Sequence, residues 1–149
     1  MKHTIIVLVC AFFSLNSFSQ ILDPVKWTTA VKKTSDTEAV LTATANIDAN
    51  WHLYSQNVPE GGPVATTFTF EGNSNYLKKG NTSEDEGHVI DDPIFNMKIK
   101  YFANKAIFKQ RIKLKTQQTF SVKSTVTFMV CDDSRCLPPT EVDLEFEIK

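Results

Sequence analysis

Apolar and polar residues alternate along most of the chain with a period of two. In Ala39–Ile47, for example, Leu41 and Ala43 fall on one face, and Val40 and Thr42 fall on the other. Because successive side chains of a strand point to opposite faces, this pattern predicts β-strands. The expected strands are residues 25–32, 39–47, 51–55, 65–72, 98–102, 106–115, 120–130 and 141–148. No stretch shows a convincing helical periodicity.

Turn-forming residues separate the expected strands. They occur at residues 48–50, 60–63, 72–74 and 104–105. Many short strands at fairly even spacing are typical of an all-β fold, and here they favour an immunoglobulin-like β-sandwich. In such a sandwich we expect Trp51 to be buried in the core and His52, its neighbour, to lie at the surface.

The longest stretch without clear alternation is Leu77–Asn96, which we expect to be an irregular loop. Its middle part holds Glu84, Asp85 and Glu86. These acids lack the spacing of an EF-hand, so we expect a solvated acidic loop rather than a calcium site. The end of the stretch, Pro93–Phe95, is apolar and can fold back onto the domain.

The first nineteen residues have the layout of a secretory signal peptide. Lys2 and His3 precede an apolar run that is too short to span a membrane, which takes about 20 residues. Small residues then lead to an expected cleavage after Ser19, which leaves residues 20–149 as one exported domain. Cys10 lies in the apolar run, but Val9 before it is bulkier than lipoprotein processing requires, so lipidation is the less favoured alternative.

The mature domain has no sequence feature of a nucleic-acid-binding or membrane-spanning protein. Loss of Lys2 leaves 15 of the 16 basic residues against 17 acidic ones, a net charge of −2. The one basic stripe occupies alternate positions of an expected strand and is interpreted as a solvated sheet face; it consists of Lys109, Arg111, Lys113 and Lys115. We therefore expect neither a nucleic-acid partner nor stable membrane insertion after signal cleavage.

The candidate chemistry lies in the cysteine pair, Cys131 and Cys136. An exported protein with two cysteines this close is expected to pair them. A disulfide that closes so small a ring contributes only roughly 2 kcal/mol by loop entropy, so its spacing modestly favours a redox role over a structural one. Both interpretations stay open at this point. Metal binding is the weakest of the three, because structural zinc usually takes four ligands.

The residues around the pair bear on its reactivity. Asp132 and Asp133 disfavour a nearby thiolate, whereas Arg135 favours one, and the sequence does not decide between them. Pro138 and Pro139 follow Cys136 closely. Because proline cannot donate to a strand ladder, they either end a strand or form a rigid support for Cys136.

The segment Cys136-Leu137-Pro138-Pro139-Thr140-Glu141, placed after a C-x4-C hairpin in an exported β-rich domain, resembles the N-terminal periplasmic domain of the thiol:disulfide interchange protein DsbD. Trp51–Phe70 is similar to an early strand pair of that family, and the resemblance covers nearly all of the mature chain. Four residues separate the cysteines here, whereas the best-known members have five.

The resemblance implies a function. Cys131 and Cys136 would relay electrons through dithiol–disulfide exchange, with Cys136 bonding to partners and Cys131 resolving. A cap loop would shield the pair from unwanted partners; Phe95 is the candidate cap, with Asp92 near it and Tyr54 beside the cysteines. Filling of the core by Phe95 is the competing interpretation.

The implied partners are thioredoxin-fold proteins of the periplasm, such as disulfide isomerases and thioredoxins of cytochrome c maturation. A membrane electron carrier on a separate chain would supply the electrons, and no cofactor is expected. Whether such a domain acts as a protein-disulfide reductase in its own right stays open. The alternative function is a non-catalytic binding or assembly domain whose disulfide is structural.

Overall fold

The computed structural model describes residues 22–149, which form eleven strands and no helix. The predicted signal peptide and Cys10 lie outside the described residues. The strands are β1 (Val25–Ser35), β2 (Glu38–Ile47), β3 (His52–Tyr54), β4 (Thr67–Phe70), β5 (Tyr76–Glu84), β6 (His88–Asp92), β7 (Met97–Ala103), β8 (Lys105–Leu114), β9 (Phe120–Phe128), β10 (Val130–Cys131) and β11 (Thr140–Ile148). The predicted all-β class is confirmed.

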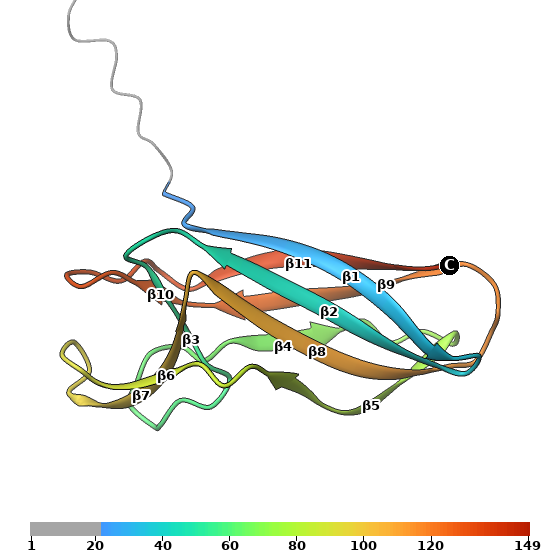
Figure 1. The fold of residues 1–149 in the computed structure, drawn as a ribbon, viewed down its shortest axis with the longest axis horizontal. Helices are drawn as coiled ribbons and strands as arrows, with labels where there is room; N and C mark the ends of the chain where they lie inside the picture. The colour runs from blue at the N-terminus through green and yellow to red at the C-terminus, as the bar shows by residue number, and fades with distance from the viewer. Residues whose placement is uncertain (1–21) are drawn as a thin grey trace, which may run out of the picture.

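The strands form three antiparallel sheets with the orders β1-β2-β8-β5, β11-β9-β4 and β10-β3-β7-β6. The first two pack face to face as a sandwich, and the third lies at one end of the molecule (Figure 1). Aromatic contacts join the two faces of the sandwich. Trp27 of β1 lies 5.4 Å from Phe128 and 5.9 Å from Phe68, measured between ring centroids.

The alternation in the sequence matches the observed strand faces. In β2 the residues Leu41, Ala43 and Ala45 are buried, while the positions between them are less so. Trp51 is 8% exposed, as predicted for a core residue. His52 is only partly exposed, because its ring packs edge-on against Tyr101 at 4.5 Å.

The expectation of an irregular loop over Leu77–Asn96 is wrong. The segment forms most of β5 and all of β6, with a short turn at residues 85–87 between them and another at residues 93–96 before β7. Both are edge strands, so most of their side chains are exposed and carry no apolar alternation. The register of β5 also shifts between Lys79 and Ser83, which interrupts its period of two.

The predicted strand over residues 120–130 is divided at Met129 into β9 and β10. This break lets the chain leave the sandwich and join the end sheet. β10 pairs with β3 through Val130 opposite Leu53 and Cys131 opposite His52. The division therefore carries the first cysteine onto the end sheet, where β6 and β7 also lie.

Candidate functional site

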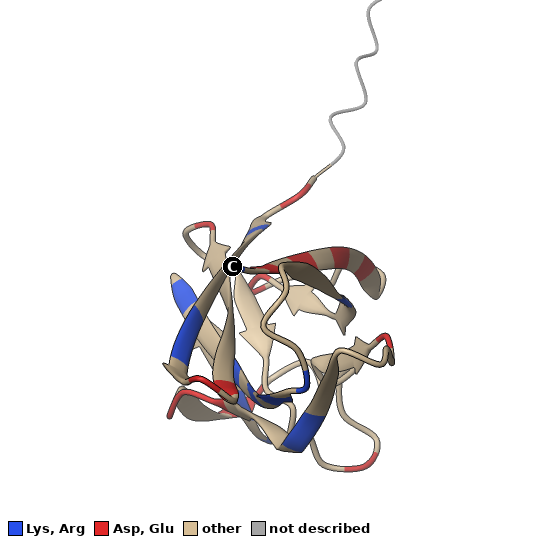
Figure 2. Cartoon of the chain, turned by 90° about the vertical axis from the view of Figure 1, so that its right-hand side faces the viewer, with Lys and Arg blue, Asp and Glu red and all other residues tan. Residues whose placement is uncertain are grey.

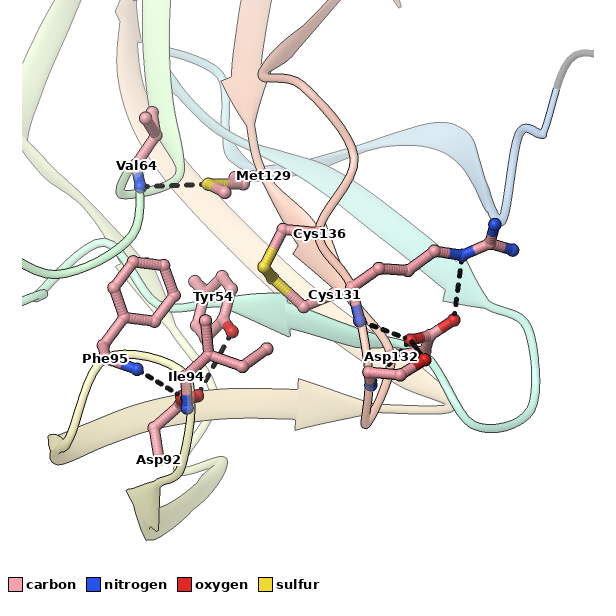
Figure 3. Close-up of a disulfide and its surroundings, with 11 residues drawn as sticks. Tyr54, Val64, Asp92, Ile94, Phe95, Met129, Cys131, Asp132 and Cys136 are labelled. Carbon is pink, nitrogen blue, oxygen red and sulfur yellow. Dashed lines mark hydrogen bonds and ion pairs between the residues drawn. A yellow bond between two sulfur atoms is a disulfide. The ribbon is translucent and has the colours of Figure 1, made fainter.

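The two cysteines are joined by a disulfide across a tight hairpin (Figure 3). Cys131 ends β10, and Cys136 lies opposite it as an isolated antiparallel bridge, with the two Cα atoms 4.0 Å apart. The Leu137 amide donates to the Val130 carbonyl at 2.9 Å, which closes the hairpin next to the disulfide. We call residues 130–137 the cysteine hairpin. A backbone hydrogen bond from the Asp132 amide to the Arg135 carbonyl, at 2.9 Å, also joins the two arms of this hairpin.

The turn between the cysteines is held by the carboxylate of Asp132. Its Oδ1 accepts from the Ser134 amide at 2.9 Å and from the Arg135 amide at 2.8 Å, and its Oδ2 accepts from the Arg135 Nε at 3.3 Å. Hydrogen bonds from Ser134 and then Arg135 lower the pKa of Asp132 to about 2. Arg135 is thus paired with the carboxylate of Asp132, the residue next to Cys131.

The disulfide belongs to a small apolar cluster apart from the main core. Tyr54, Ile99 and Cys131 form its buried centre. The partly buried residues that pack against this centre are Val58, Phe95, Met97, Tyr101, Met129 and Cys136. Cys131 is 1% exposed, whereas Cys136 is only half-buried. The two cysteines therefore differ in their access to a large partner.

A second hairpin, formed by β6 and β7, projects from the same end of the molecule (Figure 1). Asp92 starts its turn: Oδ1 accepts from the amides of Ile94 and Phe95 at 2.9 and 3.1 Å, and the Asp92 carbonyl accepts from Asn96 at 2.8 Å. Asn96 has a φ of 52°, a conformation that asparagine tolerates better than most residues. We call residues 92–97 the cap hairpin.

Tyr54 connects the cap hairpin to the cysteines. Its hydroxyl donates to Oδ2 of Asp92 at 3.2 Å, and its ring meets the Phe95 ring edge-on, with centroids 6.1 Å apart (Figure 3). Burial, and then the charge of Asp92, raise the pKa of Tyr54 well above its usual range, so the phenol keeps its proton. The structure thus brings Asp92, Phe95 and Tyr54 to the cysteine cluster. The shielding role of Asp92 and Phe95 stays a prediction.

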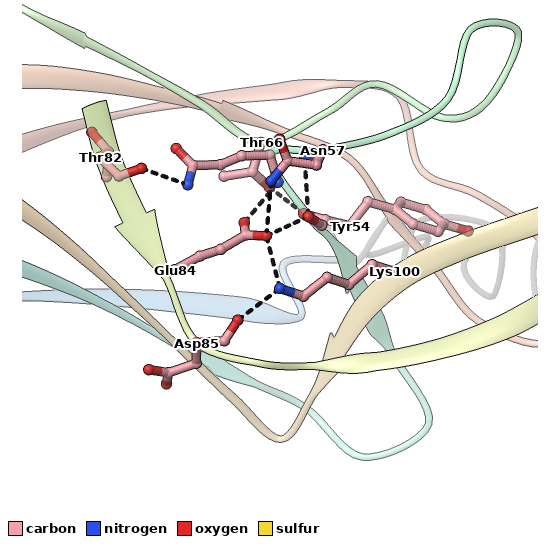
Figure 4. Close-up of polar contacts among 9 residues, drawn as sticks. Tyr54, Asn57, Thr66, Thr82, Glu84, Asp85 and Lys100 are labelled. Carbon is pink, nitrogen blue, oxygen red and sulfur yellow. Dashed lines mark hydrogen bonds and ion pairs between the residues drawn. The ribbon is translucent and has the colours of Figure 1, made fainter. Parts of the chain in front are cut away.

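The carboxylate of Glu84 lies at the centre of a polar network that the sequence did not reveal (Figure 4). Its side chain is 6% exposed and accepts from Ser55 Oγ at 2.5 Å, the Gln56 amide at 2.8 Å and Lys100 Nζ at 3.0 Å. Burial raises the pKa of Glu84, but these hydrogen bonds and the Lys100 charge outweigh it and leave the pKa lowered. The expectation of a solvated acidic loop is therefore wrong for Glu84.

This network holds the segment that follows Tyr54. Thr66 Oγ1 donates to the Tyr54 carbonyl at 2.6 Å, and the Thr66 amide donates to the Ser55 carbonyl at 3.1 Å. The end of the same segment approaches the cysteine cluster, where the Val64 amide lies 3.4 Å from Met129 Sδ. The sequence pattern did not predict the network around Glu84, because several acids in a row usually indicate a solvated loop.

No group of three or more His, Cys, Asp or Glu residues within residues 22–149 is arranged to hold a metal ion. In that same part of the chain no helix is long and apolar enough to cross a membrane.

Comparison with known protein families identifies a match over most of the chain. The family "Thiol:disulfide interchange protein DsbD, N-terminal" matches residues 19–147. No curated protein sequence matches significantly.

Solved structures share the fold at low sequence identity. The N-terminal domain of Neisseria meningitidis DsbD in its reduced form has a TM-score of 0.52 and 17% identity, over 86% of this chain and 89% of that one. The N-terminal periplasmic domain of Proteus mirabilis ScsB has a TM-score of 0.53 and 17% identity, over 81% of this chain and 44% of that one. A chain from the complex of the DsbD and PilB N-terminal domains of Neisseria meningitidis has a TM-score of 0.53 and 12% identity, over 85% of this chain and 87% of that one.

Proposed function

Because the chain belongs to the family of DsbD N-terminal domains, we propose that it is a thiol–disulfide exchange module in which Cys131 and Cys136 cycle between disulfide and dithiol. The observation that best supports this is the unequal exposure of the two cysteines. Cys131 is buried in the cluster to which Phe95 of the cap hairpin also belongs, and Cys136 is half-buried at the end of the molecule. One accessible sulfur and one protected sulfur suit an exchange reaction that passes through a mixed disulfide.

The reaction balances with a partner dithiol as the only reductant. A partner thiolate attacks the Sγ of Cys136, the Cys131–Cys136 bond breaks, and Cys131 leaves as a thiolate that takes up a proton. The second partner thiolate then attacks the partner sulfur of the mixed disulfide and releases Cys136 as a thiolate. The partner ends as a disulfide and this domain as a dithiol. The reverse sequence passes the two electrons to the next partner.

The proposed partners are thioredoxin-fold proteins of the periplasm, and a membrane electron carrier is the proposed source of electrons. A solved complex joins the N-terminal domains of DsbD and PilB. Export through a signal peptide at residues 1–19 is part of the same proposal. The periplasm is an oxidising compartment, in which a protected cysteine pair would avoid reactions with unintended partners.

The proposed role of the cap hairpin is to restrict access to the disulfide. Phe95 packs against Tyr54, and both belong to the cluster that contains Cys131. The Asp92 hydrogen bonds hold the turn in place beside this cluster. Such a shield would limit reaction with unintended thiols.

Trapping of a mixed disulfide tests the assignment of the two cysteines. Cys131→Ala removes the resolving thiol of this domain. Incubation with a thioredoxin whose second active-site cysteine is replaced by serine, and whose first is activated as a mixed disulfide with thionitrobenzoate, should yield a covalent adduct through Cys136 as thionitrobenzoate leaves. The adduct would be measured on a non-reducing gel. Cys136→Ala is the matched control and should yield at least tenfold less adduct, because Cys131 is 1% exposed. Equal trapping by both variants would contradict the assignment, and no adduct with either would contradict the exchange function.

A further inference from the structure

Charged side chains are segregated between the two outer faces of the sandwich. The outward-facing cations of the β1-β2-β8-β5 sheet, which together we call the basic face, are Lys26, Lys32, Lys79, Lys105, Lys109, Arg111 and Lys113. Glu38 is the one acidic residue on the strands of this face that points outward, within the described part of the chain. In Figure 2 the strands at the left carry blue bands, and the red bands of β11 lie on the other side of the molecule.

The opposite face has the reverse charge. β11 alternates buried apolar residues with exposed acids, namely Glu141, Asp143, Glu145 and Glu147. Within the strands of this face, β11, β9 and β4, Lys123 of β9 is the one exposed cation. The protein as a whole has a net charge of −1, so the basic face is a local concentration and not a consequence of overall composition.

Most cations of the basic face lack an internal partner. Lys79 and Arg111 are direct cross-strand neighbours and share the carboxylate of Glu38, at 2.5 and 3.7 Å. The cations that form no ion pair with any of residues 22–149 are Lys32, Lys105, Lys109 and Lys113. Like charges held close together destabilise a sheet. A partner with negative charge would relieve this repulsion.

An apolar residue lies among these cations. Leu77 of β5 is 50% exposed and pairs with Lys113 across the strands, so it lies on the basic face. Lys79 lies two residues further along β5, on the same face of the sheet as Leu77. An exposed sheet face that combines unpaired lysines with an exposed leucine is suited to the headgroup region of a bilayer, where both charge attraction and apolar burial contribute.

We propose that the basic face binds the surface of a bilayer that contains anionic phospholipids. The sheet offers its cations along β8 at alternate positions, with further cations on β1 and β5, and so presents them over an extended surface rather than at a pocket. The cysteine hairpin belongs to the β10-β3-β7-β6 sheet at the end of the molecule. Binding through the basic face therefore leaves Cys136 open to other proteins.

Vesicle co-sedimentation tests the proposal with protein that lacks the proposed signal peptide. The probe is vesicles of phosphatidylglycerol and phosphatidylcholine at roughly 1:2, compared with pure phosphatidylcholine, at about 20 mM salt. We expect binding to the anionic vesicles only, and its loss at about 0.5 M salt because the charges are then screened. The double variant Lys109→Gln/Lys113→Gln should bind about 25-fold more weakly, since each lysine near an anionic surface contributes about fivefold.

Lys123→Gln is the matched control, because it removes an exposed lysine from the opposite face; its binding should equal that of the wild type. Absence of binding to anionic vesicles, or an equal loss in the control, would overturn the proposal. Concentration-dependent self-association without vesicles that the double variant abolishes would also overturn it, by assigning the basic face to a second copy of the chain. The assay does not involve the cysteines, so its outcome is independent of the exchange function.

Discussion

At the scale of single residues, Glu84 shows how a surface-like sequence can conceal a buried group. It stands in a run of three acids, yet its carboxylate accepts hydrogen bonds from Ser55 and Gln56 and pairs with Lys100. Asp85 and Glu86, its neighbours, are exposed as expected. The difference arises from partners that are far away in the sequence, so no local pattern could have separated the three acids.

The lowered pKa of Glu84 predicts an acid-sensitive contribution to stability. Because the folded-state pKa of Glu84 lies below the ordinary value of a glutamic acid, the unfolded chain binds the proton more readily. The contribution is present above about pH 4.5 and is lost as the pH falls through the folded-state pKa. Glu84→Gln should therefore lower the free energy of unfolding by about 1–3 kcal/mol at pH 7 and by less at pH 3, as measured by urea unfolding.

Glu86→Gln is the control for this prediction, since Glu86 is exposed and belongs to the same run. Its free energy of unfolding should match that of the wild type at both pH values. A Glu84→Gln deficit that is the same at pH 3 and pH 7 would show that the charge of Glu84 does not stabilise the fold.

At the scale of secondary-structure elements, the sequence pattern missed two edge strands, β5 and β6. β5 and β6 expose most of their side chains, so they lack the alternation that revealed β2 and β8. The cap hairpin follows β6, and its apolar turn was identified from the family resemblance rather than from periodicity. Its position beside Tyr54 depends on the pairing of β3 with β7, a contact between segments that are distant in sequence.

The cap hairpin predicts a kinetic effect of a single side chain. Phe95→Ala removes the ring that packs against Tyr54, so reduction of the disulfide by dithiothreitol should become several-fold faster. The free energy of unfolding should fall by at least roughly 0.5–1.5 kcal/mol, the contribution of an aromatic pair beyond its area burial. The rate would be followed by the appearance of free thiol under pseudo-first-order conditions.

Ile94→Ala serves as the comparison, because Ile94 lies in the same turn but is 44% exposed. Its reduction rate should remain that of the wild type. If Phe95→Ala also reacts at the wild-type rate, Phe95 is a packing residue and the hairpin does not shield the cysteines.

At the scale of the whole molecule, the alternation of residue types was sufficient to predict a β-sandwich, and the position of the cysteine pair at a hairpin was also predictable. The end sheet was not, because it depends on the break at Met129 that carries Cys131 from β9 to β3. That break buries one cysteine and leaves the other partly open. The separation of charge between the outer faces likewise becomes visible only when β1, β5 and β8 are placed in one sheet.

The reduction potential of the Cys131–Cys136 pair tests the exchange function most directly. It would be obtained by equilibrating the protein with defined ratios of reduced and oxidised glutathione or dithiothreitol and counting free thiols. Exchange by this pair predicts a potential within the range of known exchange proteins, about −120 to −270 mV. A potential below about −300 mV, together with a large loss of stability on reduction, would show that the disulfide is structural and would contradict the exchange function.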